Sequence, residues 1–279
     1  MELKSHGKTL SLNKPLVMGI LNVTPDSFSD GGKFNDPSRA VERALQMIES
    51  GADIIDIGGE STGPNSKDVA VEEELTRVMP VLIALRSQTH AWISIDTYKS
   101  RVAAEALEAG ADMINDVTAL RGDSELAKVL ADYPVPVVLM FSKDSTARTT
   151  REEVQYRDVV KTVTDFLKER VEFAARHGIS RDRLILDPGM GAFVSSDPQY
   201  SLQLLNNLEE LVKLGYPVLA GPSRKSFIGQ VLDVPLDQRL EGSLAACAVA
   251  VMNGASILRV HDVQQTRRVV DMVSAIMIS

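Results

Sequence analysis

The chain has 279 residues, of which 44% are hydrophobic and 24% charged, which suits a globular protein of the size of one (β/α)8 barrel. Its net charge of −8 argues against a general affinity for nucleic acid, and a single cysteine, Cys247, excludes an internal disulfide. The first residues lack the apolar core of a signal peptide, and no apolar stretch is long enough to span a membrane. We therefore expect a cytoplasmic protein without membrane or nucleic-acid partners.

Eight short apolar segments recur along the chain, each followed by a polar loop and a helical pattern. Residues 1–15 precede them, and we expect a hairpin there that closes one end of the fold. Strands are predicted at residues 16–21, 53–57, 91–95, 113–114, 136–140, 183–186, 217–220 and 256–260. Helices are predicted from residue 36, over 71–86, up to 109, over 125–131, up to 177, over 198–214, after 226 and over 266–278.

This alternation predicts a closed parallel (β/α)8 barrel, a TIM barrel, formed by a single domain over residues 1–279. The strands read as continuous apolar runs, as expected of strands buried on both faces. An open doubly wound sheet is the alternative. It is less favoured because no GxGxxG pattern follows the first predicted strand.

Polar residues stand at the carboxyl ends of the predicted strands, where barrels of this kind build their sites. They are Asn22, Glu60, Asp96, Asn115, Asp187, Lys225, Arg259 and His261. Each alone has a structural explanation, such as a helix cap or a turn, but packing does not require such a ring on one rim. The acids, the amide and Lys225 suit a flat nitrogen heterocycle with N–H donors and a ring carbonyl. The other cations, with the helix start at Ser226, suit an anion of the phosphate type.

Seven segments resemble the signature segments of dihydropteroate synthases and run in the same order. They are LNVTPDSFSDGG (21–32), GGEST (58–62), ISIDT (93–97), INDV (114–117), LDPGMG (186–191), SRKSFIG (223–229) and RVHDV (259–263). The resemblance implies a transferase of folate biosynthesis. It would condense (7,8-dihydropterin-6-yl)methyl diphosphate with 4-aminobenzoate to give 7,8-dihydropteroate and diphosphate. It also implies a Mg²⁺ cofactor and a homodimer.

The resemblance also implies a role for each matching residue. The pterin-binding set is Asp96, Asn115, Met140, Asp187 and Lys225; the diphosphate-binding set is Asn22, Ser226, Arg259 and His261, with Asn22 also the Mg²⁺ ligand. The aminobenzoate-binding set is Phe28, Thr62, Pro64, Phe193, Ser223 and Arg224, and the catalytic set is Lys225, Asp96 and Asp30. The implied course is loss of diphosphate, with its charge stabilised, before attack by the arylamine. A first loop containing Phe28 and Asp30 would exclude water, and no dedicated general base is expected.

Three places depart from the usual pattern of this family. Gly63 stands where an arginine is usual after Glu60-Ser61-Thr62, so that Arg148 or Arg151 is a candidate substitute. Phe141 replaces the usual histidine after the fifth strand. The segment DPGMGAF resembles sulfonamide-tolerant members, and bulk from Phe193 is expected to reject sulfonamides that protrude beyond the outline of aminobenzoate.

Two rival functions remain at this point. One is a pterin-binding methyltransferase-like domain, which shares the barrel but has no reason for the diphosphate-binding residues in SRKS and RVHD. The other is a catalytically silent pterin-binding protein, for which Gly63 is the main argument. Release of diphosphate from pterin diphosphate in the presence of aminobenzoate would separate both from the synthase.

Overall fold

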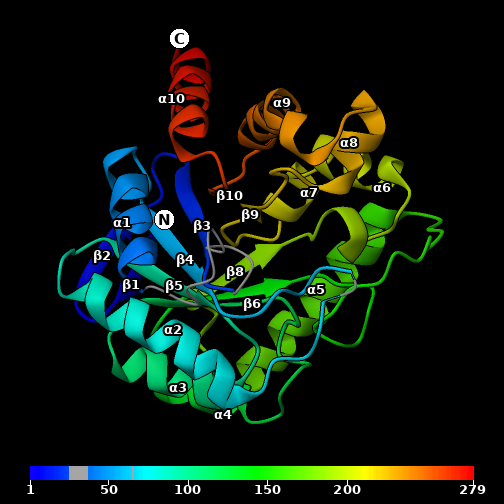
Figure 1. Ribbon diagram of the computed structural model, residues 1–279. Coiled ribbons are helices and arrows are strands. Elements are labelled where there is room, and N and C mark those ends of the chain that lie inside the picture. The colour runs from blue at the N-terminus through cyan, green and yellow to red at the C-terminus, as the bar shows by residue number, and fades with distance from the viewer. Residues whose placement is uncertain (25–36, 65) are drawn as a thin grey trace.

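The computed structural model describes residues 1–24, 37–64 and 66–279, so the predictions at Phe28 and Asp30 lie outside the described residues. Eight parallel strands form one sheet in the order β8-β7-β6-β5-β4-β3-β10-β9, which lies at the centre of the molecule in Figure 1 with helices around it. The strands are β3 (Leu16–Asn22), β4 (Ile54–Gly58), β5 (Trp92–Asp96), β6 (Met113–Asp116), β7 (Val137–Met140), β8 (Leu184–Asp187), β9 (Leu219–Ala220) and β10 (Ile257–Val260).

The sheet closes between its first and last strands, which confirms the predicted (β/α)8 barrel. Leu186 and Val218 form a parallel bridge there, and the Leu186 N–H donates to the Pro217 carbonyl at 2.9 Å. The strand predicted at 217–220 contains only two residues, Leu219 and Ala220. Proline has no N–H to donate to a ladder, so Pro217 and Pro222 limit regular pairing on both sides.

Ten helices surround the strands in the described residues, two more than the eight predicted, because the helix over 240–252 was not predicted and the one predicted over 198–214 is divided. They are α1 (Pro37–Glu49), α2 (Val71–Arg86), α3 (Ser100–Glu108), α4 (Leu126–Asp132), α5 (Val159–Arg176), α6 (Pro198–Asn206), α7 (Glu209–Val212), α8 (Ser226–Leu232), α9 (Leu240–Met252) and α10 (Val263–Ile278). Local chemistry sets several ends: the Asp158 carboxylate caps α5 by accepting from the Lys161 N–H at 2.9 Å. Gly51 ends α1 with φ of +98°, a conformation that glycine adopts without strain.

One predicted helix is divided. The pattern over 198–214 predicted a single helix, but the chain turns between α6 and α7. Asn207 adopts a non-helical conformation at the end of α6, and its side-chain amide donates to the Gln203 carbonyl at 2.8 Å. Leu208, the next residue, is fully buried at this break in the helix.

Two layers of apolar side chains hold the barrel together. One lies between strands and helices, and the other fills the barrel interior with Met18, Ile54, Trp92 and Met113 among its members. A hairpin of β1 (Glu2–Ser5) and β2 (Lys8–Ser11) lies at the amino-terminal end of the barrel, where Leu3 is buried in the interior layer. In the described part of the chain, no helix is both long and apolar enough to cross a membrane.

A buried ionic contact ties the hairpin to the barrel. The Asp112 carboxylate is inaccessible to solvent and accepts from Lys8 Nζ at 2.9 Å, from the Ile93 N–H at 3.0 Å and from Arg86. We expect Asp112→Ala to lower the free energy of unfolding by about 3 kcal/mol, because it removes the carboxylate paired with Lys8 and Arg86 and leaves the Ile93 N–H without its acceptor. Urea denaturation measures this, with Asp132→Ala, an exposed site, as the control. Equal stability of the two variants would contradict the prediction.

Candidate active site

The carboxyl ends of the strands enclose a small cavity at the barrel mouth. It is lined by Thr62, Asp96, Asn115, Val117, Met140, Asp187, Met190, Phe193, Gly221, Lys225 and Arg259. All five residues of the predicted pterin-binding set therefore lie together, although they come from five different strand ends. Arg259, assigned by resemblance to the diphosphate, lines the same cavity.

Arg259 bridges two carboxylates in the floor of this cavity. Its Nε donates to Asp56 Oδ2 and its terminal nitrogen to Asp96 Oδ2, each at 2.6 Å. The Asn115 side-chain amide also donates to Asp56 Oδ2, at 3.1 Å. The Arg259 guanidinium thus neutralises Asp56 and Asp96, and these two carboxylates hold it in the predicted pterin pocket.

Asp56 is a site residue that the sequence reasoning missed. It is fully buried in β4, and its Oδ1 has no hydrogen-bond partner among the described residues. Side chains alternate along a strand, so Asp56 lies on the same inward face as Ile54, which belongs to the barrel interior. The sequence did contain a signal for Asp56: a carboxylate at an inward position of a buried strand needs a partner inside the barrel.

Burial shifts the ionisation of the acids and the lysine in this cavity. Burial raises the pKa of Asp96 to about 7; Arg259 opposes the shift and the Asp56 carboxylate adds to it. Burial also raises the pKa of Asp187 to about 6, opposed by the Gly189 N–H and by Lys225. For Lys225, burial and repulsion from Arg259 lower the pKa to about 8. Each group is therefore poised within about a unit or two of neutral pH.

The turn after β8 orients Asp187. The Gly189 N–H donates to Asp187 Oδ1 at 2.8 Å, which holds that oxygen and leaves the other for the cavity. Gly189 has φ of +65°, and a Cβ there would lie 2.3 Å from the Phe141 carbonyl oxygen. Only glycine fits this position, which explains the glycine in DPGMG. Phe141, found where histidine is usual, is buried and packs edge-on against Phe166 in α5, with ring centroids 5.1 Å apart.

The Ser223-Arg224 and His261 segments lie side by side but do not line the small cavity. His261 and Ser223 are joined twice: the His261 N–H donates to Ser223 Oγ at 3.2 Å, and Oγ lies 3.1 Å from Nδ1. Burial, with repulsion from Arg259, lowers the pKa of His261 to about 4, so the imidazole is neutral at pH 7. Arg224 is directed to Asp262, with bonds of 2.9 and 2.6 Å, rather than to a cavity.

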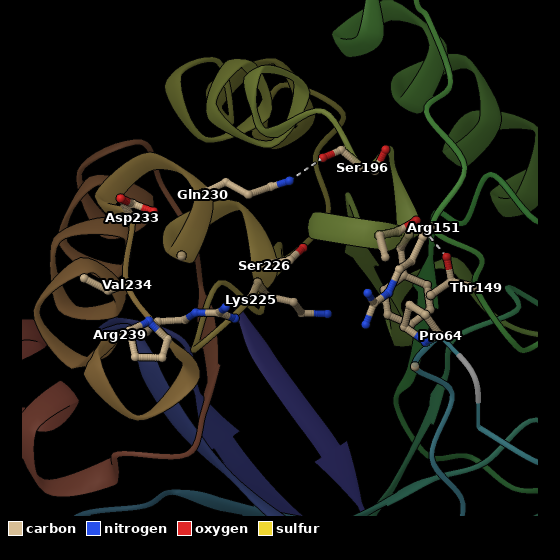
Figure 2. A pocket seen from close by; sticks show the side chains of 15 residues that line it. Pro64, Thr149, Arg151, Ser196, Lys225, Ser226, Gln230, Asp233, Val234 and Arg239 are labelled. Atoms are coloured by element: carbon tan, nitrogen blue, oxygen red, sulfur yellow. Dashed lines mark hydrogen bonds between the residues drawn. The ribbon is translucent and has the colours of Figure 1, made fainter.

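A larger cavity of about 760 Å³ opens beside the small one (Figure 2). Its lining includes Pro64, Phe193 and Ser226 of the predicted sets, together with Lys225. Phe193 and Lys225 line both cavities, and the Lys225 ammonium lies 4.6 Å from the centroid of the Phe193 ring. Thr62 lines the small cavity instead. Residues that sequence reasoning did not assign to a site, Thr149, Ala192, Ser196, Gln230 and Arg239 among them, complete the larger wall.

Three loops that carry the cavity wall are tied to one another. The Thr149 N–H donates to the Thr62 carbonyl at 3.1 Å, and its hydroxyl donates to the Ala192 carbonyl at 2.7 Å. Arg148 pairs with Glu60 and Asp68, and Lys99 pairs with Glu60 and Glu74. Glu60 therefore belongs to a buried ionic network and lines neither cavity. Asn22 and His261 of the predicted ring also line neither cavity, whereas Asp96, Asn115, Asp187, Lys225 and Arg259 line the small one.

Asn22 lies at the end of β3, next to Asp96. An ideal Cβ at Gly58 would be 3.7 Å from both Asn22 Oδ1 and Asp96 Oδ2, so these two oxygens flank the glycine. Within residues 1–24, 37–64 and 66–279, no group of three or more His, Cys, Asp or Glu side chains gathers in a metal-binding arrangement. This sparse oxygen set suits Mg²⁺, which keeps several waters and takes further ligands from substrate phosphates.

An acid-lined cavity and a larger cavity with three cations in its lining share a wall at the barrel mouth, an arrangement that suits an enzyme with two small-molecule substrates. Comparison with known proteins gives the same class, since residues 18–261 match the family described as pterin binding enzyme. The chain is 46% identical to the dihydropteroate synthase of Haemophilus influenzae over 266 residues, covering 95% of each chain. It is 44% identical to that of Escherichia coli K12, covering 99% of this chain and 96% of the relative.

Solved structures agree with the sequence comparison. The chain superposes on the Xanthomonas albilineans dihydropteroate synthase with 4-aminobenzoic acid with a TM-score of 0.93 at 45% identity, covering 100% of this chain and 98% of the other. The Yersinia pestis dihydropteroate synthase with a sulfonamide drug gives a TM-score of 0.94 at 41% identity, covering both chains fully. The chain belongs to the dihydropteroate synthase family. It is a transferase that forms 7,8-dihydropteroate from dihydropterin diphosphate and 4-aminobenzoate.

Proposed function

We propose that the small cavity binds the pterin ring and that the larger cavity binds 4-aminobenzoate. The observation that carries this division is that Phe193 and Lys225 line both cavities, so the two substrates meet at a common wall. A structure of a relative holds 7,8-dihydropteroate, the compound that would span both cavities. Steady-state assays with the two substrates and Mg²⁺, which detect diphosphate and dihydropteroate separately, test the proposal. Diphosphate release without dihydropteroate would indicate a different acceptor.

The acids of the small cavity would hold the pterin by its N–H donors. Asp187 and Asn115 offer oxygen acceptors, and the Lys225 ammonium donates to a ring carbonyl. Pterin donors would compete with Arg259 for Asp96, because Arg259 now occupies one oxygen of that carboxylate. Binding of the ring to Asp96 would therefore release one side of the Arg259 guanidinium, which could then bind the diphosphate. His261 and Ser226 belong to the same proposed diphosphate-binding set.

We include Mg²⁺ as the cofactor, with Asn22 as its protein ligand. The ion would neutralise diphosphate charge as the C–O bond to the pterin methylene breaks. The chain's own contribution is to orient the ring, to hold positive charge near the departing anion and to keep water from the cationic methylene carbon. Calorimetry of diphosphate binding with and without Mg²⁺, in the parent and in Asn22→Ala, tests this assignment. Equal Mg²⁺ dependence in both proteins would refute it.

The pKa shifts predict how pterin binding depends on pH. Asp187 and Asp96 accept hydrogen bonds when ionised, so binding strengthens as the pH rises through about 6 to 7. Lys225 donates when protonated, so binding weakens as the pH rises through about 8. We expect affinity for a pterin without phosphate to peak between pH 7 and 8. Fluorescence titration from pH 5 to 9 measures it, with a phosphate-free ligand so that no phosphate titrates and with the ligand's own ring ionisation measured separately in the absence of protein. Constant affinity would contradict the assignment.

Phe193 is proposed to discriminate against sulfonamides. Its ring is buried, packs on Lys225 and forms the wall shared by both cavities. Groups that extend beyond the outline of aminobenzoate would collide with this ring. We expect the parent to show a sulfonamide inhibition constant well above its KM for 4-aminobenzoate, and Phe193→Ala to lower that ratio by about tenfold, the effect of one or two apolar groups in a pocket. A parent ratio near one would refute this role.

We also propose that the chain forms a homodimer through the faces of α6, α8 and α9. Large apolar side chains are exposed there, including Leu202, Val231, Val249 and Met252, around an apolar groove of about 480 Å³. These helices lie on one side of the barrel in Figure 1, next to α10. Light scattering after gel filtration tests the proposal with Val249→Glu. A monomeric parent at micromolar concentration would refute it.

The single cysteine, Cys247, is buried and unpaired, which supports a cytoplasmic location.

A further inference from the structure

We propose that Arg151 binds the carboxylate of the acceptor and so fills the place left by Gly63. The proposal rests on the assignment of the larger cavity to 4-aminobenzoate. Arg151 lines that cavity and is absent from the lining of the smaller one. Figure 2 shows it on the same side as Pro64, with Lys225 and Arg239 on the opposite side. A flat anion placed between these walls lies within a field of three cations.

Arg151 differs from the other arginines around the mouth because its guanidinium has neither an ion pair nor a hydrogen bond within the described residues. Arg148 pairs with Glu60 and Asp68, and Arg224 pairs with Asp262. Arg259 pairs with Asp56 and Asp96, and Arg239 donates to the Arg224 carbonyl at 3.0 Å. The Arg151 guanidinium makes no ion pair or hydrogen bond with the described part of the chain. Of the two candidate substitutes for the missing arginine, Arg148 is thus already paired with carboxylates of the protein, whereas Arg151 remains available to a ligand.

The orientation of the acceptor places its carboxylate on the Arg151 side. The amine must reach the pterin methylene at the wall that Phe193 and Lys225 share between the two cavities. The carboxylate is at the opposite end of the aromatic ring, and so it points away from the small cavity. Arg151 lines only the larger cavity, where this end lies. A guanidinium binds a carboxylate with two parallel hydrogen bonds, which also fixes its orientation.

The backbone around Arg151 is held in place on both sides. Thr149 is bonded to Thr62 and Ala192, and the Asp144 carboxylate accepts from the Thr150 N–H at 3.0 Å. On the other side, the Glu152 carbonyl accepts from the Ser196 N–H at 3.2 Å. The bond from Thr149 to Thr62 also places position 63 close to this segment. Residues 63 and 151 therefore lie in the same part of the wall of the larger cavity, so an arginine at either position would add its charge there.

An arginine also fits at position 63 itself. The φ of Gly63 is not in the left-handed region, and the nearest described atom to an ideal Cβ there is Ser61 Oγ, at 3.7 Å. A guanidinium can thus be returned to the loop where relatives usually carry it. This gives a reciprocal test in which the function of one position is restored at the other.

The experiment compares the parent, Arg151→Gln, Gly63→Arg and the double variant in steady-state kinetics. Arg151→Gln is expected to raise KM for 4-aminobenzoate by about tenfold or more, since a charge-assisted bidentate contact is lost, with KM for the pterin diphosphate unchanged. An uncharged acceptor, 4-aminobenzamide, should be affected less than twofold. Gly63→Arg in the Arg151→Gln background should recover most of the loss. Arg157→Gln, an exposed arginine outside both cavities, is the control.

Three outcomes would overturn the assignment of Arg151, and each can be distinguished from a result that refutes the proposed enzymatic function. If the parent turns over both substrates and Arg151→Gln leaves KM for 4-aminobenzoate unchanged, Arg151 does not bind the acceptor. If 4-aminobenzamide suffers equally, the residue only supports the loop. If KM for the pterin diphosphate rises instead, the bound anion is diphosphate. Absence of turnover in the parent would refute the proposed function, and this assignment with it.

Discussion

Asp187→Asn is expected to lower kcat/KM for the pterin diphosphate by about 100- to 1,000-fold. One Asp187 oxygen is held by the Gly189 N–H, and the side chain is buried in the small cavity beside Lys225. Asparagine would present an N–H group where the pterin requires an acceptor. A hydrogen bond to a charged group contributes roughly 1.5–3 kcal/mol, and the uncompensated donor adds about 1–3 kcal/mol to the loss. The effect should appear in pterin binding, measured by fluorescence titration, as well as in turnover.

The matched control is Asp182→Asn, near the amino-terminal end of the same strand, where the carboxylate is exposed and accepts only from Ser180 in the described structure. It should retain parental kinetics. The free energy of unfolding of Asp187→Asn should not fall, since the substitution removes a buried charge. A large drop in stability together with the drop in activity would mean that Asp187 is structural, and near-parental kcat/KM would exclude it from pterin recognition.

Arg259→Met is expected to destabilise the protein in a way that depends on pH. Removal of the guanidinium leaves the Asp56 and Asp96 carboxylates buried without their shared cation, which costs about 3 kcal/mol at neutral pH or above. Without Arg259 the pKa of Asp96 rises further above about 7, because Arg259 now opposes the effect of burial. A folded-state pKa above the unfolded value makes stability fall as pH rises toward it. The deficit relative to the parent should therefore be largest above pH 7 and smaller near pH 5.

Urea denaturation of the parent and the variant at pH 5, 7 and 8.5 measures this deficit. Arg259→Lys should recover part of the stability, because an ammonium keeps the charge but loses the two-sided contact. Activity should be lost in Arg259→Met at every pH, since we also propose that this residue binds the diphosphate. A deficit that does not vary with pH would show that the cation does not control the ionisation of Asp96.

Much of the fold was predictable because its signal is local. Continuous apolar runs such as LVMGIL and helical stripes such as Ala40, Ala44 and Met47 depend only on which faces must be buried. Eight such units leave few chain paths other than a closed barrel. Places where the prediction was less accurate, the two-residue β9 and the break at Asn207, depend on prolines and turn contacts that periodicity does not register.

The site was predictable in part for the same reason. Residues at strand ends must meet at the mouth of a barrel, so Asp96, Asn115, Asp187 and Lys225 were expected to converge, and they do. Asp56 was missed because it lies within a strand rather than at its end. The choice between Arg148 and Arg151 was open, because both are arginines in the same polar segment with nothing in the local pattern to separate them.

By itself the sequence determined the barrel, the order of its units and the chemical character of its mouth, because these follow from burial and from residue types at strand ends. Only the tertiary structure decided which charges are paired with one another. It placed Arg259 between Asp56 and Asp96, joined Arg148 to Glu60, and left Arg151 facing the larger cavity. Such pairing depends on distances between segments up to 203 positions apart in the chain, and no local pattern contains that information.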